Sequence, residues 1–302
     1  MGGHLRIFSC LVLAGGLVTS AMALAPAASA AAAQHQASVC AGTPKAPGVL
    51  TGRHRSDVVV KGACEVNAGR AFVGGSLTLR PGAVLIAAFA LNDRTGKGSS
   101  SLTVAGDLRV GAGAAMVLGC DPSSFPCLDD PDQNAPTLAS HDRVLANLTS
   151  TKPLGVVVHN VSVRGNVTQR GGGGGFSCNP SGIFAQFQSP VYSTYEDSSV
   201  GGSIRVSGVT SCWMGLIRLH VRQSMAVRNN RLADPDAIEI NANHIAGNLT
   251  CRRNSMVWDS GDLTANLFPR QPQPNTVGGE RRGQCVLNSP TSPHDPPGPG
   301  PF

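Results

Sequence analysis

The chain has 302 residues and a formal net charge of +6, with 14% charged and 4% aromatic residues. Its length suits one elongated domain or two small ones. The basic residues are dispersed, with Arg252-Arg253 and Arg281-Arg282 the only arginine doublets, and this dispersion argues against nucleic acid as a partner.

The first 30 residues predict a secretory signal peptide. Arg6 gives a basic start, an apolar run follows over residues 7–24, and Ala28-Ser29-Ala30 supplies the small residues that signal peptidase reads. We expect cleavage near Ala30, with Ala32 and Ala33 as neighbouring sites. A retained membrane anchor is the alternative, which Gly15-Gly16 inside the apolar run disfavours.

The rest of the chain predicts an exported protein with no transmembrane segment. No later stretch reaches the roughly 20 apolar residues that span a bilayer. We expect a low-complexity leader over residues 31–39, a folded domain over 40–288 and a disordered proline-rich tail over 289–302. Export also makes a nucleic-acid partner unexpected. Without Arg6 the mature chain has 23 Lys and Arg against 18 Asp and Glu, so an anionic cell-wall or envelope polymer is the candidate partner.

The cysteines predict a disulfide framework. Nine cysteines less Cys10 of the signal peptide leave an even set of eight, as an oxidising compartment requires. Eight cysteines allow 105 pairings. The absence of Cys-x-x-Cys spacing disfavours a metal site, and no cofactor is expected. The simplest pairing is sequential: Cys40 with Cys64, Cys120 with Cys127, Cys178 with Cys212, and Cys251 with Cys285.

A repeated unit of alternating apolar residues around a glycine runs along the chain. Residues 73–79 (VGGSLTL) are echoed 31 residues later by residues 104–110 (VAGDLRV). Further copies begin near Val163, Gly201 and Ile245. Short β-branched runs with turn residues between them predict an all-β chain. A repeat with variable insertions is typical of a solenoid.

We therefore predict a disulfide-stapled right-handed parallel β-helix, with a β-sandwich as the alternative. The glycine of each unit fits a corner where a Cβ would meet the neighbouring coil, and Asn166 and Asn248 should stack or adopt a left-handed turn. Residues 121–141 and 170–189 are expected to be loops, the second a flexible excursion. The predicted inward residues are Val73, Leu77, Leu79, Val104, Leu108, Val110, Val163, Val167, Ile204, Val206, Ile245 and Leu249.

The units Gly106-Asp107-Leu108 and Gly247-Asn248-Leu249 resemble those of bactofilin-type and related β-helix proteins. Residues 245–285 resemble the end of small, uncharacterised exported proteins of high-GC Gram-positive bacteria. The resemblance implies fold and location and no particular activity. Bactofilins are cytoplasmic polymers without disulfides, so polymerisation is not implied for this chain.

Candidate catalytic residues are few. Glycoside cleavage needs two carboxylates at a defined separation. The densest acids, Asp129, Asp130 and Asp132, fall in a proline-rich loop, where they read as solvated acids or, with Asn134, as weak calcium ligands. A lyase would need acids beside a base. The candidates are Asp234, Asp236 and Glu239 with Arg228 or Arg231, and a charged turn is the favoured interpretation of this stretch.

The remaining polar and aromatic candidates also favour structural roles. His141 and Asp142 are neighbours whose side chains point apart in a strand. His159, His220 and His244 are expected at the surface or as satisfied structural residues. Two Trp and two Tyr are too few for a sugar-stacking platform. Of these, Tyr192 and Tyr195 lie close in sequence, Trp258 is isolated, and Trp213 beside Cys212 is expected to pack.

The sequence thus predicts an exported, non-enzymatic structural or cell-surface protein without naming its molecular activity. A secreted polysaccharide lyase or glycoside hydrolase of β-helix fold is the alternative, and the catalytic residues of such an enzyme remain unknown.

Overall fold

The computed structural model describes residues 37–233, 238–255, 257–258 and 274–286. By their contacts, residues fall into two units, Met1–Gln34 and His35–Phe302, and the described residues all belong to the second. The expected signal peptide, residues 31–36 of the leader and the proline-rich tail lie outside the described residues. No helix among the described residues is long and apolar enough to cross a membrane.

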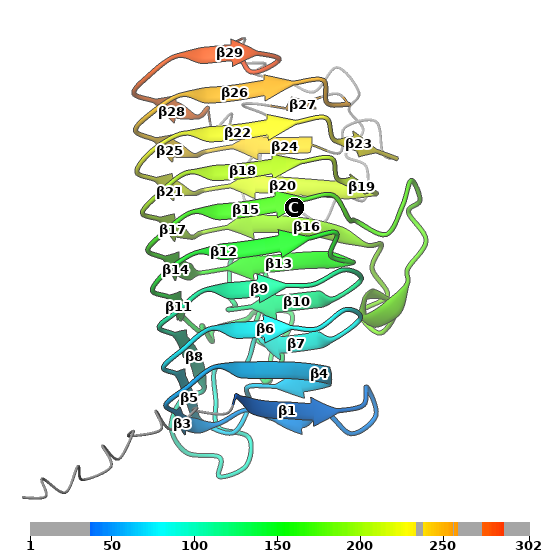
Figure 1. The fold of residues 1–302 in the computed structure, drawn as a ribbon, viewed down its shortest axis with the longest axis vertical. Coiled ribbons are helices and arrows are strands. Elements are labelled where there is room, and N and C mark those ends of the chain that lie inside the picture. Colours follow the sequence, from blue (N-terminus) through cyan, green and yellow to red (C-terminus); the bar gives the residue numbers. More distant parts are fainter. Residues whose placement is uncertain (1–36, 234–237, 256, 259–273, 287–302) are drawn as a thin grey trace, which may run out of the picture. The chain divides into compact units, whose positions relative to one another are not determined.

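The described strands form three stacks of parallel strands, which we name stacks 1, 2 and 3 (Figure 1). Stack 1 contains β1 (Ser38–Gly42), β4 (Val58–Glu65), β6 (Leu77–Leu79), β9 (Leu108–Val110), β12 (Leu148–Thr151), β15 (Val167–Arg170), β18 (Ile204–Ser207), β22 (Met225–Arg228), β26 (Leu249–Arg252) and β29 (Arg281–Gly283). Stack 2 contains β2 (Gly48–Val49), the end of β4, β7 (Val84–Ala87), β10 (Ala115–Leu118), β13 (Gly155–His159), β16 (Tyr192–Glu196), β20 (Trp213–Ile217), β24 (Ile238–Asn241) and β27 (Val257–Trp258). Stack 3 contains β3 (Gly52–His54), β5 (Arg70–Val73), β8 (Ser101–Val104), β11 (Asp142–Val144), β14 (Val161–Val163), β17 (Ser199–Val200), β21 (His220–Val221), β25 (His244–Ile245) and β28 (Thr276–Val277). Two short strands, β19 (Thr210–Ser211) and β23 (Arg231–Leu232), pair outside the stacks.

Along most of the chain the strands follow one another from stack 3 to stack 1 to stack 2, and each strand pairs in parallel with the strand one circuit later. Figure 1 shows this progression from blue β1 to orange β29. Antiparallel contacts among the described residues are isolated bridges in loops, such as Cys120 with Ser140. The prediction of an all-β chain is confirmed. The sandwich alternative is wrong, because the described strands pair in parallel ladders and not in antiparallel ones.

The repeat residues occupy equivalent inward positions. Leu77 pairs directly with Leu108, and Leu108 with Leu148, so these leucines are one circuit apart. All twelve residues predicted to point inward are at most 2% exposed. The apolar alternation of the sequence therefore reports the core, since successive strand residues point to opposite faces.

The repeat glycines lie where the chain turns from stack 3 into stack 1. A Cβ on Gly106 would lie 2.7 Å from the carbonyl oxygen of Gly75, and one on Gly165 would lie 2.6 Å from that of Ala146. The following residue forms a hydrogen-bonded ladder between circuits. The backbone N–H of Asn166 donates to Asn147 Oδ1 over 2.9 Å, and that of Glu280 donates to Asn248 Oδ1 over 2.7 Å. Asn166 thus lies against Asn147 of the preceding circuit, as expected, whereas Asn248 lies between Ser224 and Glu280. Neither has the left-handed conformation that was the other expectation.

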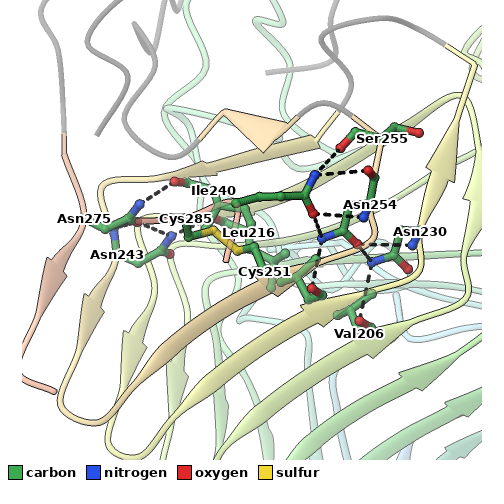
Figure 2. The surroundings of a disulfide bond; sticks show 12 residues. Val206, Leu216, Asn230, Ile240, Asn243, Cys251, Asn254, Ser255, Asn275 and Cys285 are labelled. Carbon is green, nitrogen blue, oxygen red and sulfur yellow. Dashed lines mark hydrogen bonds between the residues drawn. A yellow bond between two sulfur atoms is a disulfide. The ribbon is translucent and has the colours of Figure 1, made fainter. Parts of the chain in front are cut away.

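Further amide ladders close the other two corners (Figure 2). Asn230 Nδ2 donates to Asn254 Oδ1 over 2.9 Å, and Asn254 Nδ2 donates to Gln284 Oε1 over 3.0 Å. Asn243 Nδ2 donates to Asn275 Oδ1 over 2.7 Å. Because buried amides need partners, these ladders tie one circuit to the next.

All four sequential disulfides form, joining Cys40 to Cys64, Cys120 to Cys127, Cys178 to Cys212 and Cys251 to Cys285. The local bridge between Cys120 and Cys127 has a Cα separation of 5.0 Å. A set of four disulfides fits an oxidising compartment.

Two segments differ from what the sequence led us to expect. The first strand starts at Ser38, inside the expected leader, because residues 38–42 pair with β4. The glycine run of residues 171–175 departs from the stacks, as expected, but hydrogen bonds hold it against them. The N–H of Gly173 donates to Pro153 O and that of Gly175 to Thr210 O. It leads to the 3-10 helix η1 (Gly182–Ala185), whose Phe184 is buried.

Candidate functional site

Polar and charged side chains gather in two regions of the described residues. The first, which we name the His159 cluster, consists of Ser124, His159, Glu196, Asp197 and Arg218. The second, which we name the stack 3 groove, lies on the outer surface of stack 3. They share no residue but meet at the corner between stacks 2 and 3, where Arg218 and His220 line one hollow.

Register and turn geometry assemble the His159 cluster. His159 ends β13 and pairs with Glu196 at the end of β16. The next residue on each strand, Asn160 and Asp197, adopts a left-handed conformation with φ of 53° and 49°, and Arg218 after β20 has φ of 51°. Equivalent turns on successive circuits therefore bring Asp197 and Arg218 side by side.

Hydrogen bonds connect the cluster tightly. Arg218 donates from Nε to Asp197 Oδ1 over 2.6 Å and from its guanidinium to Glu196 Oε2 over 2.8 Å. The Ser124 hydroxyl donates to Asp197 Oδ2 over 2.9 Å and lies 3.2 Å from His159 Nδ1. Thr194 donates to Glu196 Oε1 over 2.6 Å.

The proton arrangement on His159 follows from these contacts. Ser124 has one hydroxyl proton, which Asp197 accepts, so Ser124 Oγ accepts from a protonated His159 Nδ1. Burial lowers the pKa of His159, although the nearby Glu196 opposes this shift. A neutral ring with its proton on Nδ1 presents a lone pair at Nε2. Ser124 accordingly does not deliver its proton to the imidazole, as a serine nucleophile would.

His159 is the clearest departure from expectation. The side chain is 3% exposed, and its Nε2 has no hydrogen-bond partner among the described residues. It is therefore neither a surface histidine nor a fully satisfied one. Its ring stacks on Phe125 at a centroid distance of 5.1 Å, which holds the 120–141 loop over stack 2.

The dense acids of that loop organise turns. Asp129 accepts the backbone N–H groups of Ala90 and Leu91. Asp130 accepts those of Thr137 and Leu138 over 2.7 and 2.8 Å, and the bond from Leu138 is the main reason that its pKa is lowered. Asp132 and Asn134, the other two candidate calcium ligands, belong to one turn. Asp132 accepts the backbone N–H of the exposed Asn134 over 3.1 Å.

The lyase candidates are not brought together by register. Arg228 lies in stack 1 and pairs with Ser207 and Arg252, whereas Glu239 lies in stack 2 opposite Gly215. Arg231 lies in β23, with its guanidinium 5.8 Å from the Phe176 ring centroid. Asp234 and Asp236 lie outside the described residues.

The stack 3 groove is a hollow of about 850 Å³ that crosses the circuits from β11 to β28. Arg143, Arg164 and Arg222 line it and are exposed. His220 and His244 pair in register within it and stack with a centroid distance of 4.9 Å. No Asp or Glu is among the described residues that line the groove.

These two histidines are exposed, as expected, and so is His141. Asp142 is 1% exposed, so its side chain and that of His141 point apart as predicted. Trp213 is buried and packs against Tyr192, whose ring centroid lies 6.3 Å away. The prediction that Trp213 packs is confirmed. Tyr195 is also buried, and its hydroxyl donates to Gln169. The side chain of Trp258 lies outside the described part of the structure.

The His159 cluster was missed because the residues are far apart in sequence. A signal for it does exist. His159 and Glu196 are 37 residues apart, the same offset as the paired repeat residues Val167 and Ile204. Aligning the whole circuits, rather than only the glycine units, would have placed the histidine opposite the glutamate.

Comparisons with family models, with curated proteins and with solved structures found no match for this chain.

Proposed function

We propose that this chain is an exported, right-handed β-solenoid that binds an anionic polymer of the cell wall or envelope along its stack 3 groove. Parallel crossovers in one sheet are right-handed in about 98% of cases, which supports the handedness. The four disulfides support an oxidising destination, and the N-terminal sequence supports export.

The observation that carries the binding proposal is the charge of the groove. Arginines come from circuits β11, β14 and β21, so positive charge recurs along the direction in which the circuits stack. Adjacent circuits lie about 4.8 Å apart, a spacing at which an extended polymer can meet several in succession. With no acid in its described lining, the groove presents guanidinium groups suited to phosphate or carboxylate.

The test compares two charge-matched variants of the mature protein. The groove variant carries Arg143→Gln, Arg164→Gln and Arg222→Gln. The control carries Arg205→Gln, Arg228→Gln and Arg252→Gln on stack 1. We expect the groove variant to bind polyphosphate about tenfold more weakly than the wild type, because exposed ion pairs contribute ~0.2–1 kcal/mol each.

The stack 1 control variant distinguishes binding at the groove from a general effect of net charge. Both variants lose the same net charge, so a general charge effect would weaken both equally. Equal losses, or unchanged affinity of the groove variant, would contradict binding at the groove. Binding should also weaken with added salt, as ion release predicts.

Export has its own test. Protein recovered from the culture medium should begin between Ala31 and Gln34, and it should contain no free thiol by alkylation without reductant. An intact Met1 start in the medium, or eight alkylatable cysteines, would rule out the export proposal.

Polysaccharide cleavage is the second candidate, favoured by one observation. Glu65 lines a cavity of about 330 Å³ on the outer surface of stack 2, and its pKa is raised by burial and by the charge of Asp93. A raised pKa suits a general acid. Cleavage of an anionic polysaccharide that Glu65→Gln abolishes would support this enzyme, whereas activity retained by the variant would exclude Glu65 as its acid.

A further inference from the structure

Two buried acceptor atoms face each other in the His159 cluster. His159 Nε2 lies 3.8 Å from Glu196 Oε1, and each side chain is 3% exposed. The Nδ1 proton is directed to Ser124, so Nε2 presents a lone pair toward a carboxylate oxygen. An unpaired buried acceptor is costly, and a cation between the two atoms would remove that cost.

We propose that His159 Nε2, Glu196 Oε1 and a carboxylate oxygen of Asp197 bind a divalent transition-metal ion, with zinc the best-fitting case. The three ligand atoms lie within 4.8 Å of one another. This site is separate from the stack 3 groove and does not depend on polymer binding.

The separation fits metal coordination. Zinc binds histidine nitrogen at about 2.0–2.1 Å and carboxylate oxygen at about 2.0–2.2 Å, so one ion can bridge atoms up to about 4.2 Å apart. The 3.8 Å between Nε2 and Oε1 is inside that span. A mixed imidazole and carboxylate set favours zinc and related ions over magnesium or calcium. The bond from His159 Nδ1 to Ser124 fixes the tautomer that coordination requires.

Arg218 is a built-in competitor at this site. Its guanidinium contacts both carboxylates and supplies one positive charge to them. Arg218 bonds Oε2 of Glu196, whereas Oε1 accepts from the Thr194 hydroxyl and keeps a second lone pair for the metal. Bound metal would therefore coexist with Arg218 at reduced affinity, and removing the guanidinium should strengthen binding.

The experiment titrates the disulfide-intact mature protein with Zn²⁺ by calorimetry. The background is the double variant His220→Gln/His244→Gln, which removes the exposed histidine pair as a second zinc site. We expect one equivalent to bind in this background. Adding His159→Gln should weaken binding by at least about 100-fold, because losing even an outer-shell partner costs 10–100-fold. Adding Arg218→Gln should tighten it.

If His159→Gln does not fold, X-ray absorption spectroscopy at the zinc edge tests the site without that variant. The zinc-loaded double variant should show one imidazole nitrogen with oxygen ligands. Failure of the double variant to bind zinc, affinity unchanged by His159→Gln, or a spectrum with no imidazole would each overturn the site. These outcomes leave polymer binding by the groove unaffected.

Discussion

Asp142 is enclosed between circuits at the start of β11. Its carboxylate accepts the N–H of Leu102 over 2.6 Å and that of Gly119 over 3.0 Å. Burial nevertheless raises its pKa to about 7, against the opposing effect of those two bonds. The folded chain therefore retains a proton that the unfolded chain loses near pH 4.

The sign of the resulting pH dependence is definite. The folded pKa lies above the unfolded one, so the stabilisation is full below about pH 4 and is lost as the pH rises through about 7. Asp142→Asn removes the titration, but its amide nitrogen cannot accept the second N–H as a carboxyl oxygen does. We expect its free energy of unfolding to lie below that of the wild type near pH 4, because one buried N–H loses its acceptor, and to gain on the wild type increasingly up to about pH 7. Urea unfolding across this range checks the prediction, and a difference that stays constant with pH would contradict it.

Leu108 and Arg109 are neighbours in β9 that show how one element divides between core and surface. Leu108 is fully buried between Leu77 and Leu148, whereas Arg109 points outward beside Asp107. Leu108→Asp places a charge between circuits and should lower the free energy of unfolding by at least about 4 kcal/mol. Arg109→Asp introduces the same group on the solvent side and should cost less than about 1 kcal/mol. Chemical unfolding of both variants measures the difference, and similar losses would mean that the inward assignment of the repeat is wrong.

At the scale of elements, the sequence predicted the features that depend on residues close together in the chain. Leu77 and Leu108 were recognisable as core residues because apolar and polar residues alternate around them. The glycine before each pair of strand residues is required by a close backbone contact, so the whole signal lies within a few residues. Cys120 and Cys127 were recognisable as partners because six residues separate them. The His159 cluster depends on register across circuits of 37 and 21 residues, which variable insertions conceal. The polar turns of the 120–141 loop likewise depend on partners elsewhere in the chain, such as Ala90 for Asp129.

At the scale of the described unit of parallel strands, the three stacks differ in their exposed charge. Glu65, Glu196 and Asp197 lie on or beside stack 2, while Asp107 and Glu280 lie beside stack 1, where they pair with Arg109 and Arg282. Exposed arginines occupy stack 1 and the groove of stack 3. The unit therefore offers an anionic polymer two basic faces, and the stack 3 face is hollowed into a groove from β11 to β28.

Arginine footprinting of the mature protein tests binding at the groove most directly. Phenylglyoxal modification with and without polyphosphate, read by mass spectrometry, compares the two basic faces in one molecule. We expect the polymer to protect Arg143, Arg164 and Arg222 while Arg205, Arg228 and Arg252 on stack 1 react as before. Equal protection of both faces, or protection of stack 1 alone, would contradict it.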